Sequence, residues 1–168
     1  MTGMQGSVMP AESAAGKSGW PVTEDLDLTL ASNLSAVRMT LKRLVARLMR
    51  EGVGEETAAR VELVLAEVLN NVVKHALRDR SDGVISVNVT REGARLVFDV
   101  ADEGVPMPGE ALPSGAMPSG NGSIEDLPEG GFGWPLIHQL TDEVSYQRQG
   151  DWNVLRFFME LSASDQCA

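Results

Sequence analysis

The sequence predicts a single α+β domain, a two-layer α/β sandwich in which helices cover one face of an antiparallel sheet. The chain has 168 residues, of which 43% are hydrophobic, and this is enough for one domain with one core. Several segments alternate apolar and polar residues, as strands do, and two long segments carry apolar residues at helical spacing. The predicted order of strand, helix, helix, hairpin, loop, helix and hairpin places the helices on one side of an antiparallel sheet.

The first two elements are a strand and a capped helix. Residues 25–30 read D-L-D-L-T-L, which predicts a half-buried strand. Ser32 or Asn33 is expected to cap the helix that follows, because short polar side chains accept hydrogen bonds from the first turn of a helix. Gly52 and Gly54 are expected to end this helix.

A second helix and a hairpin come next. Apolar residues at helical spacing predict a helix over residues 55–77. Residues 85–89 and 96–100 alternate on either side of a Glu-Gly turn, which predicts an antiparallel hairpin that leads the chain to Asp102.

The last third of the domain begins with a long irregular loop. Residues 105–130 hold five of the eight prolines, five glycines and no lysine or arginine. A loop of this length predicts a lid over a site, and the alternative is a disordered insertion. A short helix over residues 134–140 and strands over residues 144–148 and 153–161 are expected to complete the domain.

The domain is expected to occupy residues 23–162. Residues 1–22 are small, polar and non-periodic, which predicts a disordered tail, and residues 163–168 are expected to form a short C-terminal tail. The sequence shows no signal peptide and no stretch that could span a membrane. The only cysteine, Cys167, leaves no disulfide framework, which favours a reducing cytoplasm.

The charge balance argues against direct nucleic-acid binding. The chain has 24 acidic and 14 basic residues and a formal net charge of -10, whereas nucleic-acid binders carry basic surfaces. An acidic protein can still bind ATP, because backbone amides, one lysine and a divalent cation can neutralise the phosphates locally.

The second helix carries the first candidate site. A helical wheel places a group of polar residues on the side opposite its apolar face, namely Glu67, Asn71, Lys74, His75 and Arg78. A solvated surface is the simpler interpretation. Glu67 and Asn71, one turn apart, nevertheless combine a potential base with an oxygen ligand of the kind that Mg²⁺ prefers.

Two glycine motifs complete the set of candidates. In Asp102-Glu103-Gly104, the carboxylate could accept a hydrogen bond from an exocyclic amine and the glycine would let a flat ring approach, although a solvated turn explains the motif equally well. The run G-G-F-G that ends at Gly133 opens onto a predicted helix, whose free N–H groups suit a phosphate. The sequence has neither a P-loop nor the strand-glycine-helix order of a dinucleotide fold.

Together the three motifs resemble a known family. They are similar to the nucleotide-binding boxes of the GHKL, or Bergerat-fold, ATPases. The matching runs are E-V-L-N-N-V-V-K-H-A at residues 67–76, D-E-G at residues 102–104 and G-G-F-G-W-P-L-I from residue 130. The likeness covers roughly residues 26–161. Within that superfamily the chain most resembles the bacterial anti-sigma-factor serine/threonine kinases, with which it also shares a run like L-I-H-Q-L-T-D-E-V.

The resemblance implies a role for each matching residue. Glu67 would be the general base, Asn71 the Mg²⁺ ligand and Asp102 the acceptor for the adenine amine of ATP. The remaining expected nucleotide-binding residues are Lys74, His75, Gly104, Gly131 and Gly133. The chain departs from the family pattern at Trp134-Pro135, after the glycines, and at Asn153, where a threonine is common.

The resemblance also implies partners. The chain would phosphorylate a STAS-type anti-anti-sigma protein, could sequester a sigma factor and could form a homodimer. One alternative is a nucleotide-binding module that sequesters its partner without phosphoryl transfer. Another is a histidine-kinase-like ATPase domain, which is disfavoured because residues 1–66 contain no histidine to accept a phosphoryl group.

Overall fold

The structure is a computed structural model that describes residues 26–31, 33–78, 80, 82–115 and 133–166. The predicted N-terminal tail, Gly131 and residues 116–130 of the predicted lid lie outside the described residues. The strands and helices are β1 (Leu26–Ala31), α1 (Leu34–Arg50), α2 (Glu55–Asn71), β2 (Val84–Glu92), β3 (Arg95–Asp102), α3 (Gly133–Leu140), β4 (Glu143–Gln149) and β5 (Trp152–Glu160).

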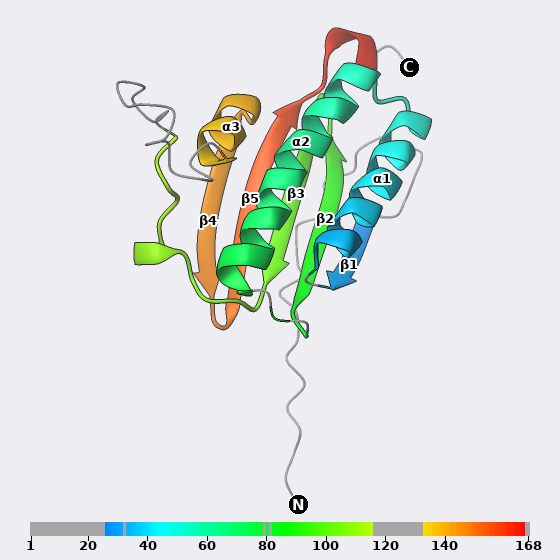
Figure 1. The fold of residues 1–168 in the computed structure, drawn as a ribbon. Coiled ribbons are helices and arrows are strands. Elements are labelled where there is room, and N and C mark those ends of the chain that lie inside the picture. The colour runs from blue at the N-terminus through cyan, green and yellow to red at the C-terminus, as the bar shows by residue number, and fades with distance from the viewer. Residues whose placement is uncertain (1–25, 32, 79, 81, 116–132, 167–168) are drawn as a thin grey trace, which may run out of the picture.

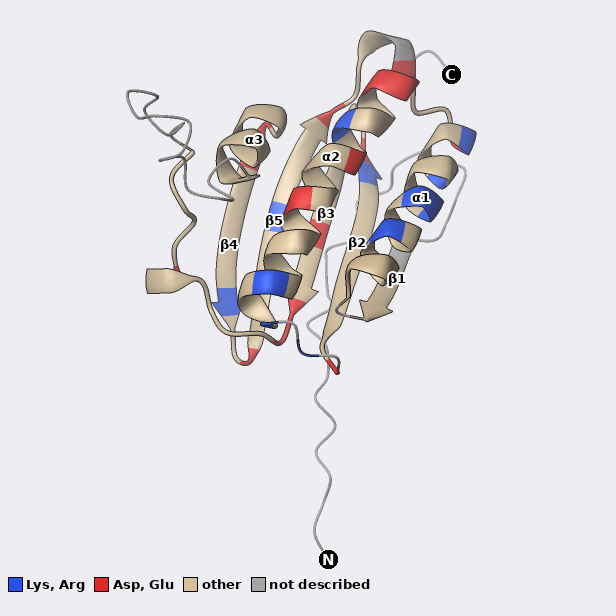
Figure 2. Ribbon diagram, in the orientation of Figure 1, with Lys and Arg blue, Asp and Glu red and all other residues tan. Residues whose placement is uncertain are grey.

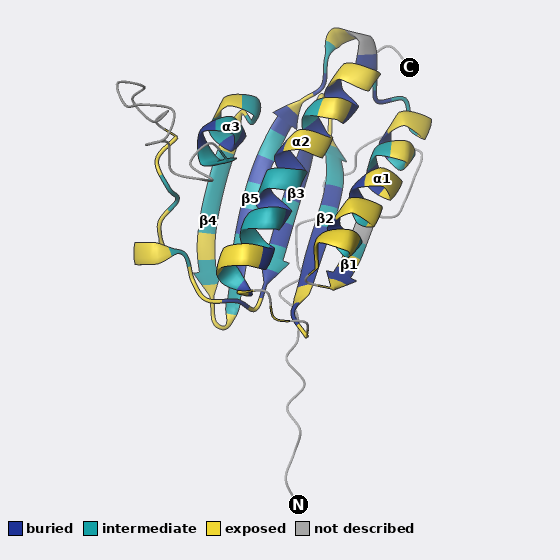
Figure 3. Cartoon of the chain, in the orientation of Figure 1, coloured by how far each residue is buried: buried dark blue, intermediate teal, exposed yellow. Residues whose placement is uncertain are grey.

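The predicted fold class is confirmed. The five strands form one antiparallel sheet in the order β1-β2-β3-β5-β4. Figure 1 shows α1, α2 and α3 side by side over one face of this sheet, with α2 across its middle. In Figure 3 the outer sides of α1 and α2 are largely exposed, whereas α3 is mostly buried or half-buried.

The core lies between the helices and the sheet. Phe98 of β3 and Phe157 of β5 stack at its centre, with ring centroids 4.7 Å apart. Both rings are fully buried, as are Leu65 and Leu69 of α2. Burial of such large side chains is the main term that stabilises the domain.

The first helix begins and ends where the sequence predicts. Asn33 is its N-cap, and the Asn33 side chain accepts a hydrogen bond of 2.8 Å from the N–H of Ala36. After the helix, Gly52 adopts a φ of 89°, a left-handed conformation that favours glycine. The exposed side of α1 is locally basic, as Figure 2 shows, although the whole chain carries a net charge of -10.

The second helix differs from the prediction at its C-terminal end. Regular α-helix stops at Asn71, and a π-helical turn continues over Val72–Ala76. The N–H of Leu77 therefore donates to the carbonyl of Val72, five residues back, over 2.8 Å. The wider turn rotates every side chain after Asn71 away from its position on an α-helical wheel.

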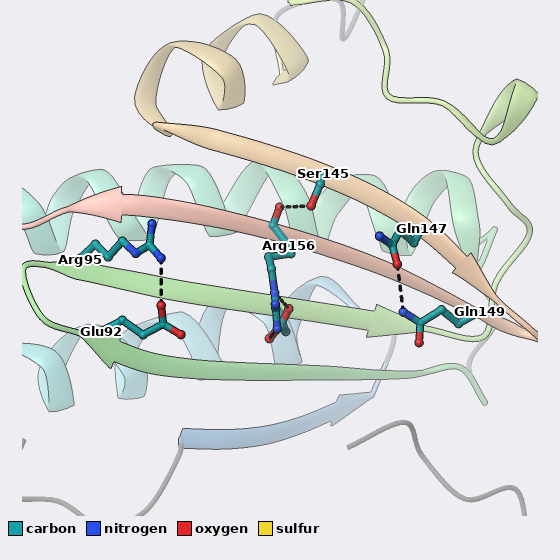
Figure 4. A network of polar contacts seen from close by, with 7 residues as sticks. Glu92, Arg95, Ser145, Gln147, Gln149 and Arg156 are labelled. Carbon is teal, nitrogen blue, oxygen red and sulfur yellow. Dashed lines mark hydrogen bonds and ion pairs between the residues drawn. The ribbon is translucent and has the colours of Figure 1, made fainter. Parts of the chain in front are cut away.

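The face of the sheet opposite the helices carries several polar contacts. Figure 4 shows some of them, among which Arg156 pairs with Asp99 at 2.6 Å and Arg95 pairs with Glu92 at 3.0 Å. Such partly exposed ion pairs contribute little to stability. Among the described residues, no helix is long and apolar enough to cross a membrane.

Four residues of the predicted C-terminal tail, 163–166, pack against the domain. Ala163–Gln166 form a 3-10 turn, and Asp165 is buried against the N-terminus of α2. Its carboxylate accepts hydrogen bonds from the N–H of Gly54 and from the hydroxyl of Thr57. Because Gly54 has no side chain to cap α2, a residue more than a hundred positions away supplies the cap.

Replacing Asp165 by asparagine should lower the free energy of unfolding by about 2 kcal/mol at pH 7. Burial alone would raise the pKa of Asp165, but hydrogen bonds from Thr57, Ser162 and Gly54 outweigh it and lower that pKa to about 2. A lowered pKa stabilises the fold at pH values above the unfolded value of 3.8, and this stability is lost as the pH falls towards 2.

Urea unfolding at several pH values measures this difference. The gap between wild type and Asp165→Asn should be widest near neutral pH and should close at acidic pH. Glu143→Gln, which changes an exposed carboxylate at the start of β4, is the control and should stay close to wild type. Equal stability of wild type and Asp165→Asn at pH 7 would show that this cap contributes nothing.

Candidate functional site

The fold brings the second helix and the third motif into contact. A Cβ atom added to Gly133, the first residue of α3, would lie 2.8 Å from Oε2 of Glu67 and 3.7 Å from Nδ2 of Asn71. Glu67 and Asn71 therefore face the N-terminus of α3, one helical turn apart on α2. Any side chain at position 133 would displace the Glu67 carboxylate from its place beside the start of α3.

The side-chain amide of Asn71 carries a buried nitrogen without a partner. Among the residues that the structure describes, its Nδ2 atom makes no hydrogen bond. A buried polar group without a partner is costly, and such groups occur where a ligand completes the bonding. The amide can donate to a phosphate oxygen through nitrogen or, with its ends exchanged, present its oxygen to a cation.

The second motif packs against the end of the same helix. A Cβ atom on Gly104 would lie 2.5 Å from the backbone carbonyl of Ala76, so no larger residue fits there. The N–H of Val105 donates to that same carbonyl over 2.9 Å. These contacts fix the start of the long loop against the π-helical turn.

Asp102 is held at the end of β3 as a buried acceptor. Its side chain is almost fully buried, and Oδ1 accepts hydrogen bonds of 2.8 Å from the N–H of Gly104 and from Nδ2 of Asn153. Burial raises the pKa of Asp102, while the hydrogen bonds from Asn153 and Gly104 and the charge of Arg148 oppose this rise. Among the described residues, Oδ2 accepts no hydrogen bond.

Asn153 is the centre of a polar network that the sequence did not reveal. Its Oδ1 accepts hydrogen bonds from the hydroxyl of Tyr146 at 2.7 Å and from the guanidinium of Arg148 at 2.8 Å. Arg148 also donates to the carbonyl of Gly104 at 2.9 Å. The signal was present in the predicted last hairpin, because its register places Arg148 opposite Asn153.

Lys74 and His75 are not brought into this cluster by any contact. Both lie on the π-helical turn with exposed side chains, and neither makes a hydrogen bond or ion pair with the described residues. The α-helical wheel that grouped them with Glu67 and Asn71 fails beyond residue 71, because the π turn has a different rotation per residue. Arg78 lies beyond the turn with a φ of 50°.

The first part of the long loop is anchored at two places. The N–H of Met107 donates to the hydroxyl of Tyr146 at 3.1 Å, next to a short 3-10 turn at Pro108–Glu110. Further on, Nε2 of His138 lies 3.1 Å from the carbonyl of Pro113, and Gly115 packs directly against the same imidazole. His138 thus fastens the loop to α3, a packing role of the kind that its place in an apolar helix predicts.

The site fits a nucleotide with a divalent cation. Gly104 packs directly against the backbone of Ala76 and Gly133 against the Glu67 carboxylate, and Nδ2 of Asn71 has no hydrogen-bond partner among the described residues. Among the described residues, no group of three or more His, Cys, Asp or Glu could hold a metal ion. Asn71, phosphate oxygens and water would together offer a cation the oxygen ligands that Mg²⁺ takes.

This antiparallel sheet has helices on one face, with Gly133 against α2 and Gly104 against the turn that follows it, and it is the fold of a GHKL-type ATPase domain. The sequence profile of the family described as histidine kinase-like ATPase domain matches residues 29–159, and the chain belongs to this family.

Similar proteins carry the same domain. The chain is 30% identical to the serine-protein kinase RsbW of Staphylococcus epidermidis over 121 residues, which are 71% of this chain and 74% of that protein. It is also 30% identical to the RsbW of Bacillus velezensis over 112 residues, 66% of this chain and 68% of that protein.

A crystal structure of the RsbU and RsbW domains of a Mycobacterium tuberculosis protein shares the fold. The TM-score is 0.55 at 17% identity, over 83% of this chain. The match covers only 33% of that longer chain, so the likeness extends to the fold of one part of it.

Proposed function

We propose that this chain is an ATP-dependent serine/threonine protein kinase of the anti-sigma-factor type. The observation that carries the proposal is the position of Glu67, whose carboxylate lies beside Gly133 and one helical turn from the unpartnered amide of Asn71. A base and a candidate metal ligand thus meet at the start of a helix, where N–H groups favour phosphate. The relatives named serine-protein kinase support the proposal.

Each part of the site has a proposed task. Asp102 accepts the exocyclic amine of adenine through Oδ2, and Gly104 lets the ring lie close to the backbone. Asn71 binds Mg²⁺, and Gly131 and Gly133 line the phosphates. Lys74 and His75 contact the phosphates from the π-helical turn, which requires their exposed side chains to turn towards the nucleotide.

When bound, ATP would supply the γ-phosphoryl group, and Mg²⁺ would neutralise part of the charge on its oxygens. The chain itself has to orient the acceptor hydroxyl, exclude water and remove a proton. Glu67 is proposed to take the proton from the serine or threonine hydroxyl. Such transfer depends mainly on positioning and charge stabilisation, so one base, a metal ligand and backbone amides are sufficient.

The proposed acceptor is a STAS-type anti-anti-sigma protein, and a sigma factor is a proposed second partner. We also propose a cytoplasmic location and a homodimer, both from the likeness to the family.

The test is transfer of radiolabel from γ-labelled ATP to a purified STAS-domain protein of the same organism. Label on one serine or threonine, lost when that residue is changed to alanine, is the expected result. An absence of transfer together with ATP-dependent binding of a sigma factor would contradict the kinase proposal and favour a module that only sequesters its partner.

A further inference from the structure

The side chains around Asp102 form a network with a single consistent arrangement of donors and acceptors. The amide of Asn153 has acceptors on one side, where Nδ2 lies 2.8 Å from Oδ1 of Asp102 and 3.1 Å from the carbonyl of Val105. It has donors on the other side, the hydroxyl of Tyr146 and the guanidinium of Arg148. The opposite orientation of the amide would set donors against donors and acceptors against acceptors, so the neighbours determine it.

This orientation decides what Asp102 offers to a ligand. Because Nδ2 of Asn153 and the N–H of Gly104 both donate to Oδ1, that oxygen is occupied, and Oδ2 remains for a ligand. Two donors favour the ionised carboxylate, which can only accept hydrogen bonds. A protonated Asp102 could instead donate to a carbonyl oxygen on the ligand.

We infer that Asn153, oriented by Tyr146 and Arg148, is a specificity-determining residue that keeps Asp102 an acceptor and so selects a base with an amine over a base with a carbonyl at the same position. Tyr146 and Arg148 are positioning residues, because they act through Asn153. This inference rests on the proposed function, in which Asp102 binds adenine.

The network also ties the base site to the start of the loop. Tyr146, besides donating to Asn153, accepts a hydrogen bond from the N–H of Met107. Asn153 and Arg148 both donate to the carbonyl of Gly104. The residues that favour the ionised form of Asp102 therefore also hold residues 104–107 in place.

The test compares ADP with inosine diphosphate, in which a carbonyl replaces the adenine amine. Calorimetry on the full chain gives the ratio of the two dissociation constants for wild type and for Tyr146→Phe, which removes one hydroxyl and keeps the ring. Wild type should prefer ADP, and the substitution should reduce the preference about three- to tenfold, the effect of losing one hydrogen bond. Asn153→Ala should reduce it further.

A matched control lies between the two positioning residues. Gln147 is on the same strand, exposed on the opposite face of the sheet (Figure 4), and Gln147→Ala should leave the preference for ADP unchanged.

The pH dependence of ADP binding is a second readout. Among the described residues Arg148 supplies the charge that acts on Asp102. A weaker hydrogen bond from Asn153 should raise the pKa of Asp102, so that as the pH is lowered ADP binding is lost at a higher pH than in wild type.

Two results would contradict the inference. A loss of affinity in Tyr146→Phe and Asn153→Ala that is equal for both nucleotides, with no change in pH dependence, would reduce the network to a structural role. A wild type that prefers ADP, with the preference retained in both variants, would overturn the inference and leave the proposed function intact. A wild type that binds neither nucleotide would contradict the proposed function itself.

Discussion

Replacing Glu67 by glutamine should slow phosphoryl transfer to the partner protein about 10²- to 10⁴-fold, the usual contribution of a general base. Glutamine keeps the size of the side chain and its capacity for hydrogen bonding, but it cannot take a proton. The contact with Gly133 should persist, because the amide occupies the same space as the carboxylate. Nucleotide affinity should therefore change little.

Glu62→Gln is the matched control for this substitution. Glu62 lies on the same helix with an exposed side chain, so its replacement should leave the transfer rate unchanged. Initial rates of label transfer, measured at saturating ATP, provide the comparison. A Glu67→Gln variant that transfers at the wild-type rate would exclude Glu67 as the base, whereas loss of nucleotide binding would indicate that Glu67 organises the phosphate site.

Asp102→Asn should weaken adenine nucleotides about 10- to 100-fold, the loss expected for a hydrogen bond to a buried charged acceptor. An asparagine has one acceptor and one donor group. If its oxygen accepts from Gly104 and Asn153, its NH₂ group faces the adenine amine, and two donors meet. The exchanged orientation creates the same conflict with Gly104 and Asn153.

Asp99→Asn provides the control on the same strand. Asp99 pairs with Arg156 on the face of the sheet away from the helices, so this substitution has the same chemistry at a different location. Calorimetric titration with ADP should show weak binding only for Asp102→Asn. An unchanged affinity in a folded Asp102→Asn protein would place adenine recognition elsewhere.

Most of the fold could be predicted from the sequence because periodicity is a local signal. The half-buried strands alternate, the helices carry one apolar face each, and Asn33 and Gly52 mark the ends of α1. The change from α-helical to π-helical geometry after Asn71 could not be predicted, because a π-helical turn leaves no periodic pattern in five residues. An α-helical wheel therefore does not give the directions of Lys74 and His75.

Contacts between segments distant in sequence account for the other features of the structure that the sequence did not predict. Asp165 caps a helix that begins 110 residues earlier, and nothing in its own neighbourhood indicates this. Asn153 stood out as a departure from a family pattern and lies opposite Arg148 in the last hairpin, but others of its partners lie on segments distant in sequence. The contact of Gly133 with Glu67 joins two motifs that the sequence could place in order but not in space.

The most direct test of the proposed nucleotide site is an NMR titration of the isotopically labelled full chain with Mg²⁺·ATP. The backbone amides of Gly104 and Gly133 and the side-chain amide of Asn71 should shift strongly and saturate together, because the proposed site places all three around one nucleotide. The amides of Asp99 and Gln147, on the other face of the sheet, should move little. If saturating nucleotide leaves the signals of Gly104, Gly133 and Asn71 in place, the chain does not bind ATP at this site and the account is wrong.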